Sequence, residues 1–138
     1  MTFERSLVLD RLSAIPLFSE VEGASMQRVA ELVTEFEAPA GHVLVQPGQP
    51  GSGMFVLEEG TVAVELPGRT LELGPGEFFG ELSILADGIV RTARVRCASA
   101  VRCLAISRSD FAELLKREPR IAVSMLPVLA RRLADAQG

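Results

Sequence analysis

The hydrophobic and polar positions of the chain follow two periods, and the period changes near residue 38. Apolar residues recur at intervals of three or four through residues 1–37, which is the spacing of one helix face. Between residues 38 and 106 they alternate with polar residues in short runs, and Gly or Pro interrupts the runs every few positions. The helical spacing returns at residues 107–138. The pattern predicts a single domain over 1–138, with an N-terminal helical segment (1–37), a β-roll (38–106) and C-terminal helices (107–138).

The predicted helices are amphipathic and face a core. Residues 3–13 have the spacing of a short helix, and Ser25 is a candidate N-cap for a second helix whose apolar stripe extends to Phe36. Two helices follow residue 107, and the second begins at Pro119, where proline is tolerated in the first turn. Pro127 inside that helix should kink or shift it because it removes one backbone hydrogen bond.

The central segment is expected to form an antiparallel barrel or a double-sheet jelly roll. Its turn signals, such as Pro47-Gly48 and Pro75-Gly76, repeat at intervals of roughly eight to ten residues. Short strands are expected at residues 42–46, 54–58, 61–66, 70–73, 78–79, 92–98 and 101–106. The predicted fold class is therefore α+β and mainly β: a double-stranded β-helix (jelly-roll) β-barrel with N-terminal helices and two C-terminal helices.

Composition and charge exclude several classes of function. The formal net charge is −4, which argues against nucleic-acid binding by overall electrostatics, and the chain has no Trp or Tyr to stack on a base. No apolar run approaches the length of roughly 18 residues that a membrane span requires. The N-terminus lacks a secretory pattern, so a cytoplasmic location is expected. Four arginines on consecutive predicted strands have acidic neighbours and are interpreted as a solvated barrel face: Arg94, Arg96, Arg102 and Arg108.

Few residues are available for metal or nucleophilic chemistry. Cys97 and Cys103 are the only cysteines, and in a cytoplasmic chain they are best interpreted as small buried side chains, although a disulfide between neighbouring strands is conceivable. With His42 as the single histidine, the ligands are too few for a structural zinc site. No His-based catalytic triad has supporting context, so no enzyme activity, metal or cofactor is expected.

The strongest candidate chemistry lies in residues 78–97, which read FFGELSILADGIVRTARVRC. Its first half is predicted to pass from a strand through a turn at Gly80 into a short helical segment, whose free backbone N–H groups form an anion site. Its second half alternates as a strand, and Arg91 has the parity of the apolar positions Val95 and Cys97. An inward guanidinium costs several kcal/mol unless an anion meets it. The two halves therefore predict a phosphate pocket.

This stretch resembles the phosphate-binding cassette of the cyclic-nucleotide-binding domains, the family of the catabolite activator protein and of the protein kinase A regulatory subunits. The matching positions are Gly80-Glu81-Leu82 and Arg91-Thr92-Ala93-Arg94-Val95, with Glu81 and Arg91 ten positions apart. The resemblance implies that Glu81 accepts the ribose 2′-hydroxyl, that Arg91 pairs with the cyclic phosphate, and that Thr92 reaches the phosphate or the purine. It implies a ligand-binding set of Phe79, Gly80, Glu81, Leu82, Ser83, Arg91, Thr92 and Ala93.

The implied ligand is a cyclic purine mononucleotide, cAMP by preference and cGMP as the alternative. In the resembled family the last helix covers the purine and often packs on a partner subunit, so Arg131 and Arg132 are candidate lid residues. A homodimer through the C-terminal helix would use Leu126, Leu129 and Leu133, which equally suit packing within one chain. Two alternatives stay open: the sensor fragment of a Crp/Fnr-like transcription regulator, and a ligand-free interaction domain of the same fold. No room remains here for a helix-turn-helix domain, so we expect a stand-alone domain or a fragment.

Overall fold

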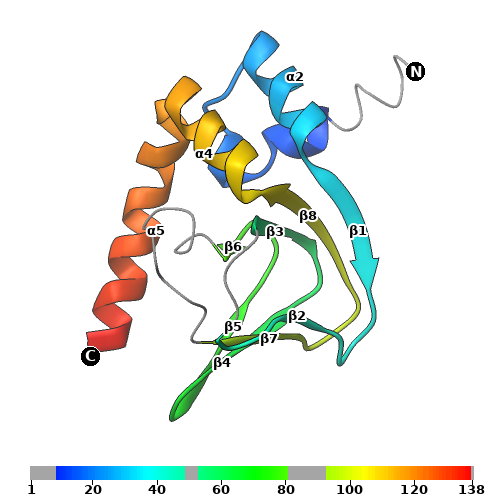
Figure 1. Cartoon of the computed structure of the whole chain (residues 1–138), viewed down its shortest axis with the longest axis vertical. Helices are drawn as coiled ribbons and strands as arrows, with labels where there is room; N and C mark the ends of the chain where they lie inside the picture. The colour runs from blue at the N-terminus through cyan, green and yellow to red at the C-terminus, as the bar shows by residue number, and fades with distance from the viewer. Residues whose placement is uncertain (1–8, 49–52, 81–92, 138) are drawn as a thin grey trace. The chain divides into compact units, whose positions relative to one another are not determined.

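The computed structural model describes residues 9–48, 53–80 and 93–137 (Figure 1). The chain divides into two compact units. The first, called here the helical unit, comprises residues 1–31 and 113–138. The second, called here the roll unit, comprises residues 32–112 and contains the strands.

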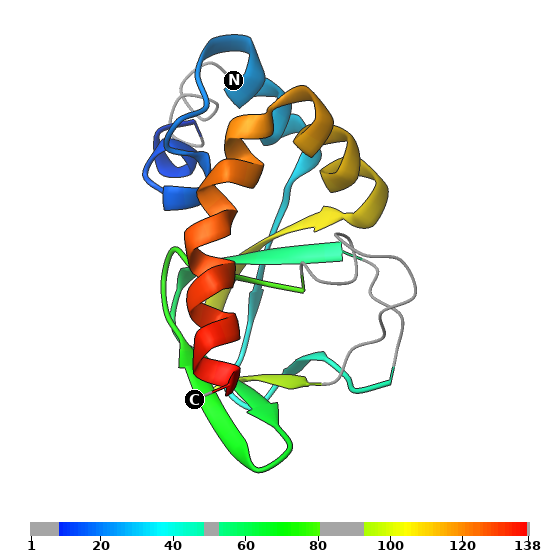
Figure 2. The ribbon, with the colours of Figure 1, turned by 90° about the vertical axis from the view of Figure 1, so that its left-hand side faces the viewer.

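The roll unit is built from two antiparallel sheets, each with four strands (Figure 1 and Figure 2). One sheet has the order β1-β8-β3-β6 and the other has the order β2-β7-β4-β5. This arrangement, with helices before and after the strands, confirms the predicted mainly-β jelly-roll class. The strands are β1 (Thr34–Ala38), β2 (Val43–Val45), β3 (Gly53–Glu59), β4 (Val62–Leu66), β5 (Arg69–Leu73), β6 (Phe78–Phe79), β7 (Arg94–Cys97) and β8 (Val101–Ser107).

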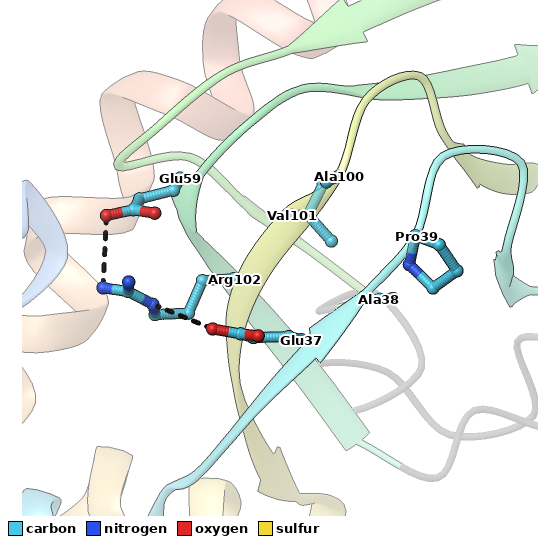
Figure 3. A pocket seen from close by; sticks show the side chains of 7 residues that line it. All are labelled: Glu37, Ala38, Pro39, Glu59, Ala100, Val101 and Arg102. Atoms are coloured by element: carbon cyan, nitrogen blue, oxygen red, sulfur yellow. Dashed lines mark ion pairs between the residues drawn. The ribbon is translucent and has the colours of Figure 1, made fainter.

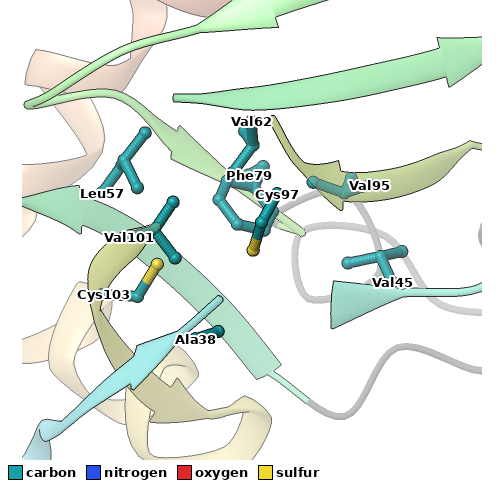
Figure 4. Close-up of a cluster of buried hydrophobic side chains, with 9 residues drawn as sticks. All are labelled: Ala38, Val45, Leu57, Val62, Phe79, Val95, Cys97, Val101 and Cys103. Atoms are coloured by element: carbon teal, nitrogen blue, oxygen red, sulfur yellow. The ribbon is translucent and has the colours of Figure 1, made fainter. Parts of the chain in front are cut away.

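The interior of the roll is an apolar cluster to which both sheets contribute (Figure 4). Its strands alternate: Val95 and Cys97 of β7 are buried, whereas Arg94 and Arg96 between them are only half-buried. Each fully buried Val or Leu side chain stabilises the fold by about 1.5–3 kcal/mol, so this alternation fixes the strand register. The cluster consists of Ala38, Val45, Leu57, Val62, Phe79, Val95, Cys97, Val101 and Cys103.

The two cysteines are free thiols inside this cluster, and both side chains are buried as the sequence predicted. Burial raises the pKa of the Cys103 thiol to about 12, and the negative charges of a Cys97 thiolate and of the Glu58 carboxylate act in the same direction. Burial also raises the pKa of Cys97. Both groups are therefore neutral, weakly reactive thiols at neutral pH.

The prediction for residues 33–36 was wrong, because the helix ends earlier than its apolar stripe suggested. Helix α2 (Gly23–Leu32) stops at Leu32, and β1 begins at Thr34. Phe36 lies in β1, where its ring packs edge-on against Phe55 with the centroids 5.9 Å apart. Packing across the sheet, from β1 to a side chain of β3, therefore outweighs the helical spacing of the apolar residues.

The helical unit contains the remaining elements. Residues 9–13 are helical and are followed by the 3-10 helix η1 (Pro16–Phe18) and by α2. The two predicted C-terminal helices are present: α4 (Arg108–Arg117), which begins in the roll unit, and α5 (Pro119–Gln137), which continues through Pro127 (Figure 2). Across the described ranges, no helix combines the length and the apolar character needed to cross a membrane.

Candidate functional site

The predicted phosphate segment joins the two sheets of the roll. Phe79 ends β6 in the first sheet, and Ala93 directly precedes β7 in the second. The two described ends of the segment therefore lie at different sheets. Five of the predicted ligand-binding residues lie outside the described residues, namely Glu81, Leu82, Ser83, Arg91 and Thr92.

The entry to this segment is held by aromatic packing and by a glycine. The ring of Phe79 stacks on that of Phe55 with the centroids 5.1 Å apart, and only 4% of Phe79 is exposed. Gly80 follows with φ 89°, in the left-handed region that strains a residue with a Cβ. The chain therefore leaves the buried strand β6 through a turn that requires glycine, which agrees with the turn predicted at Gly80.

The strand that follows the segment, β7, has the alternation of inward and outward side chains that the sequence predicted. Val95 and Cys97 point into the roll. Arg94 precedes Val95 in the strand and pairs with Glu65 on β4, so the side chains of Arg94 and Glu65 lie on the opposite face of the sheet from Val95. The strand begins at Arg94, two residues later than predicted, and Ala93 is half-buried at a bend. The inward direction of Arg91 stays a prediction.

An incompletely covered apolar surface lies on the inner face of the second sheet, and sequence reasoning did not identify it. Val64 of β4 pairs with the core residue Val95 on one side and with Leu71 of β5 on the other, so the three side chains form one row. Burial falls along this row: Val95 is 3% exposed, Val64 is half-buried and Leu71 is 36% exposed. Alternation in residues 61–73 gives the face of each residue, but only the fold shows that this edge of the row is open.

The candidate lid residues lie on α5 in the helical unit. Arg131 is exposed and Arg132 is half-buried. Their role as a cover for a purine stays a prediction.

Two of the strand arginines, Arg96 and Arg102, are paired with carboxylates, and Arg108 begins α4 rather than lying on a strand. Arg102 of β8 lies between two acidic side chains, with Nη1 3.2 Å from Glu59 Oε1 and Nε 3.8 Å from Glu37 Oε1 (Figure 3). In the second sheet, Arg96 Nη2 of β7 lies 3.6 Å from Glu65 Oε1 of the neighbouring strand β4. Beside Arg102 is a hollow of about 410 Å³, lined by Glu37, Ala38, Pro39, Glu59, Ala100, Val101 and Arg102.

This hollow offers little for specific binding, because its two carboxylates are mostly exposed and already share one guanidinium. In the part of the chain that the structure describes, no group of three or more His, Cys, Asp or Glu side chains is placed to hold a metal ion.

Comparison with known proteins gives one consistent family. A family model described as the cyclic nucleotide-binding domain matches residues 35–118, a range that encloses both halves of the predicted cassette. A cyclic nucleotide-gated potassium channel of Mesorhizobium japonicum is 37% identical over 126 residues, which cover 91% of this chain and 35% of the channel. The chain spans about a third of the length of the curated channel relatives that it matches.

Solved structures show the same fold. The crystal structure of the Thermus thermophilus catabolite activator protein superimposes with a TM-score of 0.75 at 31% identity, covering 88% of this chain and 60% of that one. A cAMP-bound PfPKA-R structure superimposes with a TM-score of 0.82 at 20% identity, covering 95% of this chain and 46% of that one, which is a likeness of fold.

Proposed function

The chain belongs to the cyclic nucleotide-binding domain family, and on that premise we propose that its roll unit binds a cyclic purine mononucleotide, cAMP first and cGMP as the alternative. One observation carries the proposal: the matched range 35–118 encloses Gly80-Glu81 and Arg91-Thr92-Ala93 at their ten-residue spacing. The name of the channel relative, a cyclic nucleotide-gated potassium channel, supports it. Binding makes and breaks no covalent bond, so the proposed role is that of a regulatory sensor and not of an enzyme.

The phosphate is the proposed anchor of the ligand. The Arg91 guanidinium would pair with it, and the backbone N–H groups near Leu82 and Ser83 would complete the cradle after the Gly80 turn. Glu81 would accept the ribose 2′-hydroxyl. The Arg91–phosphate pair would join two ionised groups and can be bidentate, whereas Glu81 would meet a neutral hydroxyl, so Arg91 should contribute more affinity than Glu81.

The open apolar row beside β7 is the proposed wall for the ribose and the purine. Val64 and Leu71 present apolar surface on the inner face, one strand and two strands away from the strand that Ala93 precedes. Such a wall has no hydrogen-bond donor or acceptor on its side chains, so it stabilises either purine by burial. The Thr92 hydroxyl is then the group in this set that can distinguish adenine from guanine.

The proposed regulatory step couples ligand binding to movement of α5. A ligand shifts such an equilibrium only by its difference in affinity for the two conformations. Arg131 and Arg132 are the proposed contacts of α5 with the purine, by stacking of a guanidinium on the base.

A homodimer through α5 is proposed as well. Val123, Leu126 and Leu133 are 62%, 61% and 61% exposed, and their spacing places them on one helix face, whereas Leu129 is half-buried. The output of the whole protein, such as a channel or a transcription regulator, and a cytoplasmic location stay proposals.

The direct test of the site is a calorimetric titration of cAMP into three variants. Arg91→Ala should weaken binding by about a hundredfold or more, because it removes one partner of a buried charge pair. Glu81→Ala should cost about tenfold.

Arg94→Ala is the matched control, since it removes an arginine three positions further along the chain, at a strand position opposite Glu65, and it should change affinity by about twofold or less. Equal losses for Arg91→Ala and Arg94→Ala would mean that the anchor is wrongly assigned.

A further inference from the structure

Three phenylalanine rings form a continuous row across the inner face of the first sheet. They come from β1, β3 and β6, and they are Phe36, Phe55 and Phe79. The ring of Phe36 meets that of Phe55 edge-on, whereas the rings of Phe55 and Phe79 are stacked, with an angle of 18° between their planes. Phe55 is therefore the central ring of the row.

The row can cross the sheet because the strand between β1 and β3 carries small side chains at this level. That strand is β8, and it places Cys103 opposite Phe36 and Ala105 opposite Phe55. A thiol and a methyl group leave space above β8, into which the two larger rings extend until they meet. Phe55 and Phe79 need no such gap, because they are Cα partners on the adjacent strands β3 and β6.

The strand that ends at Phe79 has little backbone pairing to hold it in place. β6 consists of two residues and lies at the edge of the sheet, where it pairs with β3. Two further backbone hydrogen bonds join the preceding turn to β3: Leu57 N donates to the Glu77 oxygen at 2.9 Å, and Gly76 N donates to the Leu57 oxygen at 2.7 Å. Both bonds lie before β6. The ring stack therefore acts at the other end of the strand, where the chain turns away at Gly80.

From this geometry we propose that Phe55 is a positioning residue for the phosphate of the ligand, and that it acts through Phe79 on the turn at Gly80. Glycine permits many backbone conformations, so Gly80 alone does not define the direction in which the chain leaves β6. The stacked rings supply that direction. A ligand then binds without first ordering the turn, and its apparent affinity rises with the fraction of molecules in which the turn is already in place. The part of Phe55 in binding rests on the proposed function, whereas its hold on the turn does not.

Calorimetric titration of Phe55→Leu with cAMP and with cGMP tests this role. Leucine keeps an apolar side chain at a half-buried position but has no flat face to stack on Phe79. The variant should bind both nucleotides about threefold to tenfold more weakly, since an aromatic pair contributes about this much beyond its buried area. The factor should be the same for the two nucleotides, because the turn serves the phosphate that they share. A loss for one nucleotide alone would place Phe55 against the base and would overturn the proposal.

Two further variants separate positioning from general stability. Phe111→Leu makes the same exchange at a 0% exposed phenylalanine of α4, which lies in the same compact unit but outside the row. It should lower the unfolding temperature, yet it should change the affinity by about twofold or less while the protein stays folded. Phe55→Tyr keeps the ring and should bind within about twofold of the wild type. Equal losses of affinity for Phe111→Leu and Phe55→Leu, or for Phe55→Tyr and Phe55→Leu, would show that the stack does not position the site.

Amide hydrogen exchange in the ligand-free chain tests the hold on the turn without any nucleotide. Phe55→Leu should speed exchange of the Phe79 and Gly80 amides about threefold to tenfold, whereas exchange in β4 on the other sheet should be unchanged. Unchanged rates at Phe79 and Gly80 would overturn the proposal. If the wild-type chain binds neither nucleotide, the proposed function fails, and the exchange rates still decide whether Phe55 fixes the turn.

Discussion

Raising the pH above 9 should destabilise the roll unit, because its two core thiols ionise more readily in the unfolded chain. The Cys103 thiol has an ordinary pKa of 9.0 and a folded-state pKa of about 12. Its side chain is 0% exposed, and desolvation of the thiolate is the largest cause of the shift, ahead of repulsion by Cys97 and Glu58. The folded state therefore keeps a proton that the unfolded state loses between these two pKa values.

The sign and the size of the effect follow from proton linkage. The stabilisation is fully present below pH 9 and is lost as the pH rises toward 12, since the unfolded state binds fewer protons in this window. Each pH unit inside the window lowers the free energy of unfolding by about 1.4 kcal/mol, so the loss at about pH 10.5 is about 2 kcal/mol from Cys103 alone. Cys97, whose pKa is raised as well, adds to the loss.

Urea unfolding at about pH 8 and about pH 10.5 measures this loss. The chain has no tyrosine and a single lysine, the exposed Lys116, so few other groups titrate in the same window. Cys103→Ala should lower stability at about pH 8 but should lose much less on going to the higher pH. A wild-type stability that is flat across this range, or a Cys103→Ala variant as pH-sensitive as the wild type, would refute the burial argument.

Two further substitutions test the turn geometry and the apolar wall. Gly60→Ala should destabilise the fold by about 3 kcal/mol in thermal unfolding, because Gly60 has φ 86° and an added Cβ would lie 2.2 Å from the Ala100 backbone oxygen. Gly68→Ala is the comparison: Gly68 has φ 80° but an added Cβ would meet nothing within 4 Å, so the substitution should cost about 1–2 kcal/mol. Leu71→Ser should weaken cAMP binding about fivefold to tenfold in calorimetry with little loss of stability, and Thr70→Ala on the opposite face should not; equal affinity in both variants removes Leu71 from the site.

The inward and outward faces of the strands could be predicted from the sequence, because apolar residues alternate with polar ones where one face of a strand is buried. The alternation of Arg94, Val95, Arg96 and Cys97 gave the correct faces, and the turn at Gly80 was found at a glycine with positive φ. These features depend on residues adjacent in the sequence, where spacing is informative.

Features that depend on distant partners were missed. Phe36 has a helical spacing from its predecessors, and only its contact with Phe55 across the sheet decides that it belongs to a strand. Serine is a residue type that favours N-cap positions, yet the Ser25 hydroxyl donates to Glu118, more than ninety residues away. The open edge at Leu71 likewise depends on what the other strands leave uncovered. No local pattern encodes these three outcomes.

The central claim is that the roll unit binds a cyclic purine mononucleotide through its phosphate. The measurement that tests it most directly is calorimetric titration of the nucleotide-stripped wild-type chain with cAMP, cGMP and linear 5′-AMP. We predict binding of a cyclic nucleotide with a dissociation constant of about 1 μM or tighter, corresponding to about −8 kcal/mol, and much weaker binding of 5′-AMP. An absence of heat and of thermal stabilisation with all three nucleotides would contradict the claim and would leave a ligand-free interaction domain as the function of this fold.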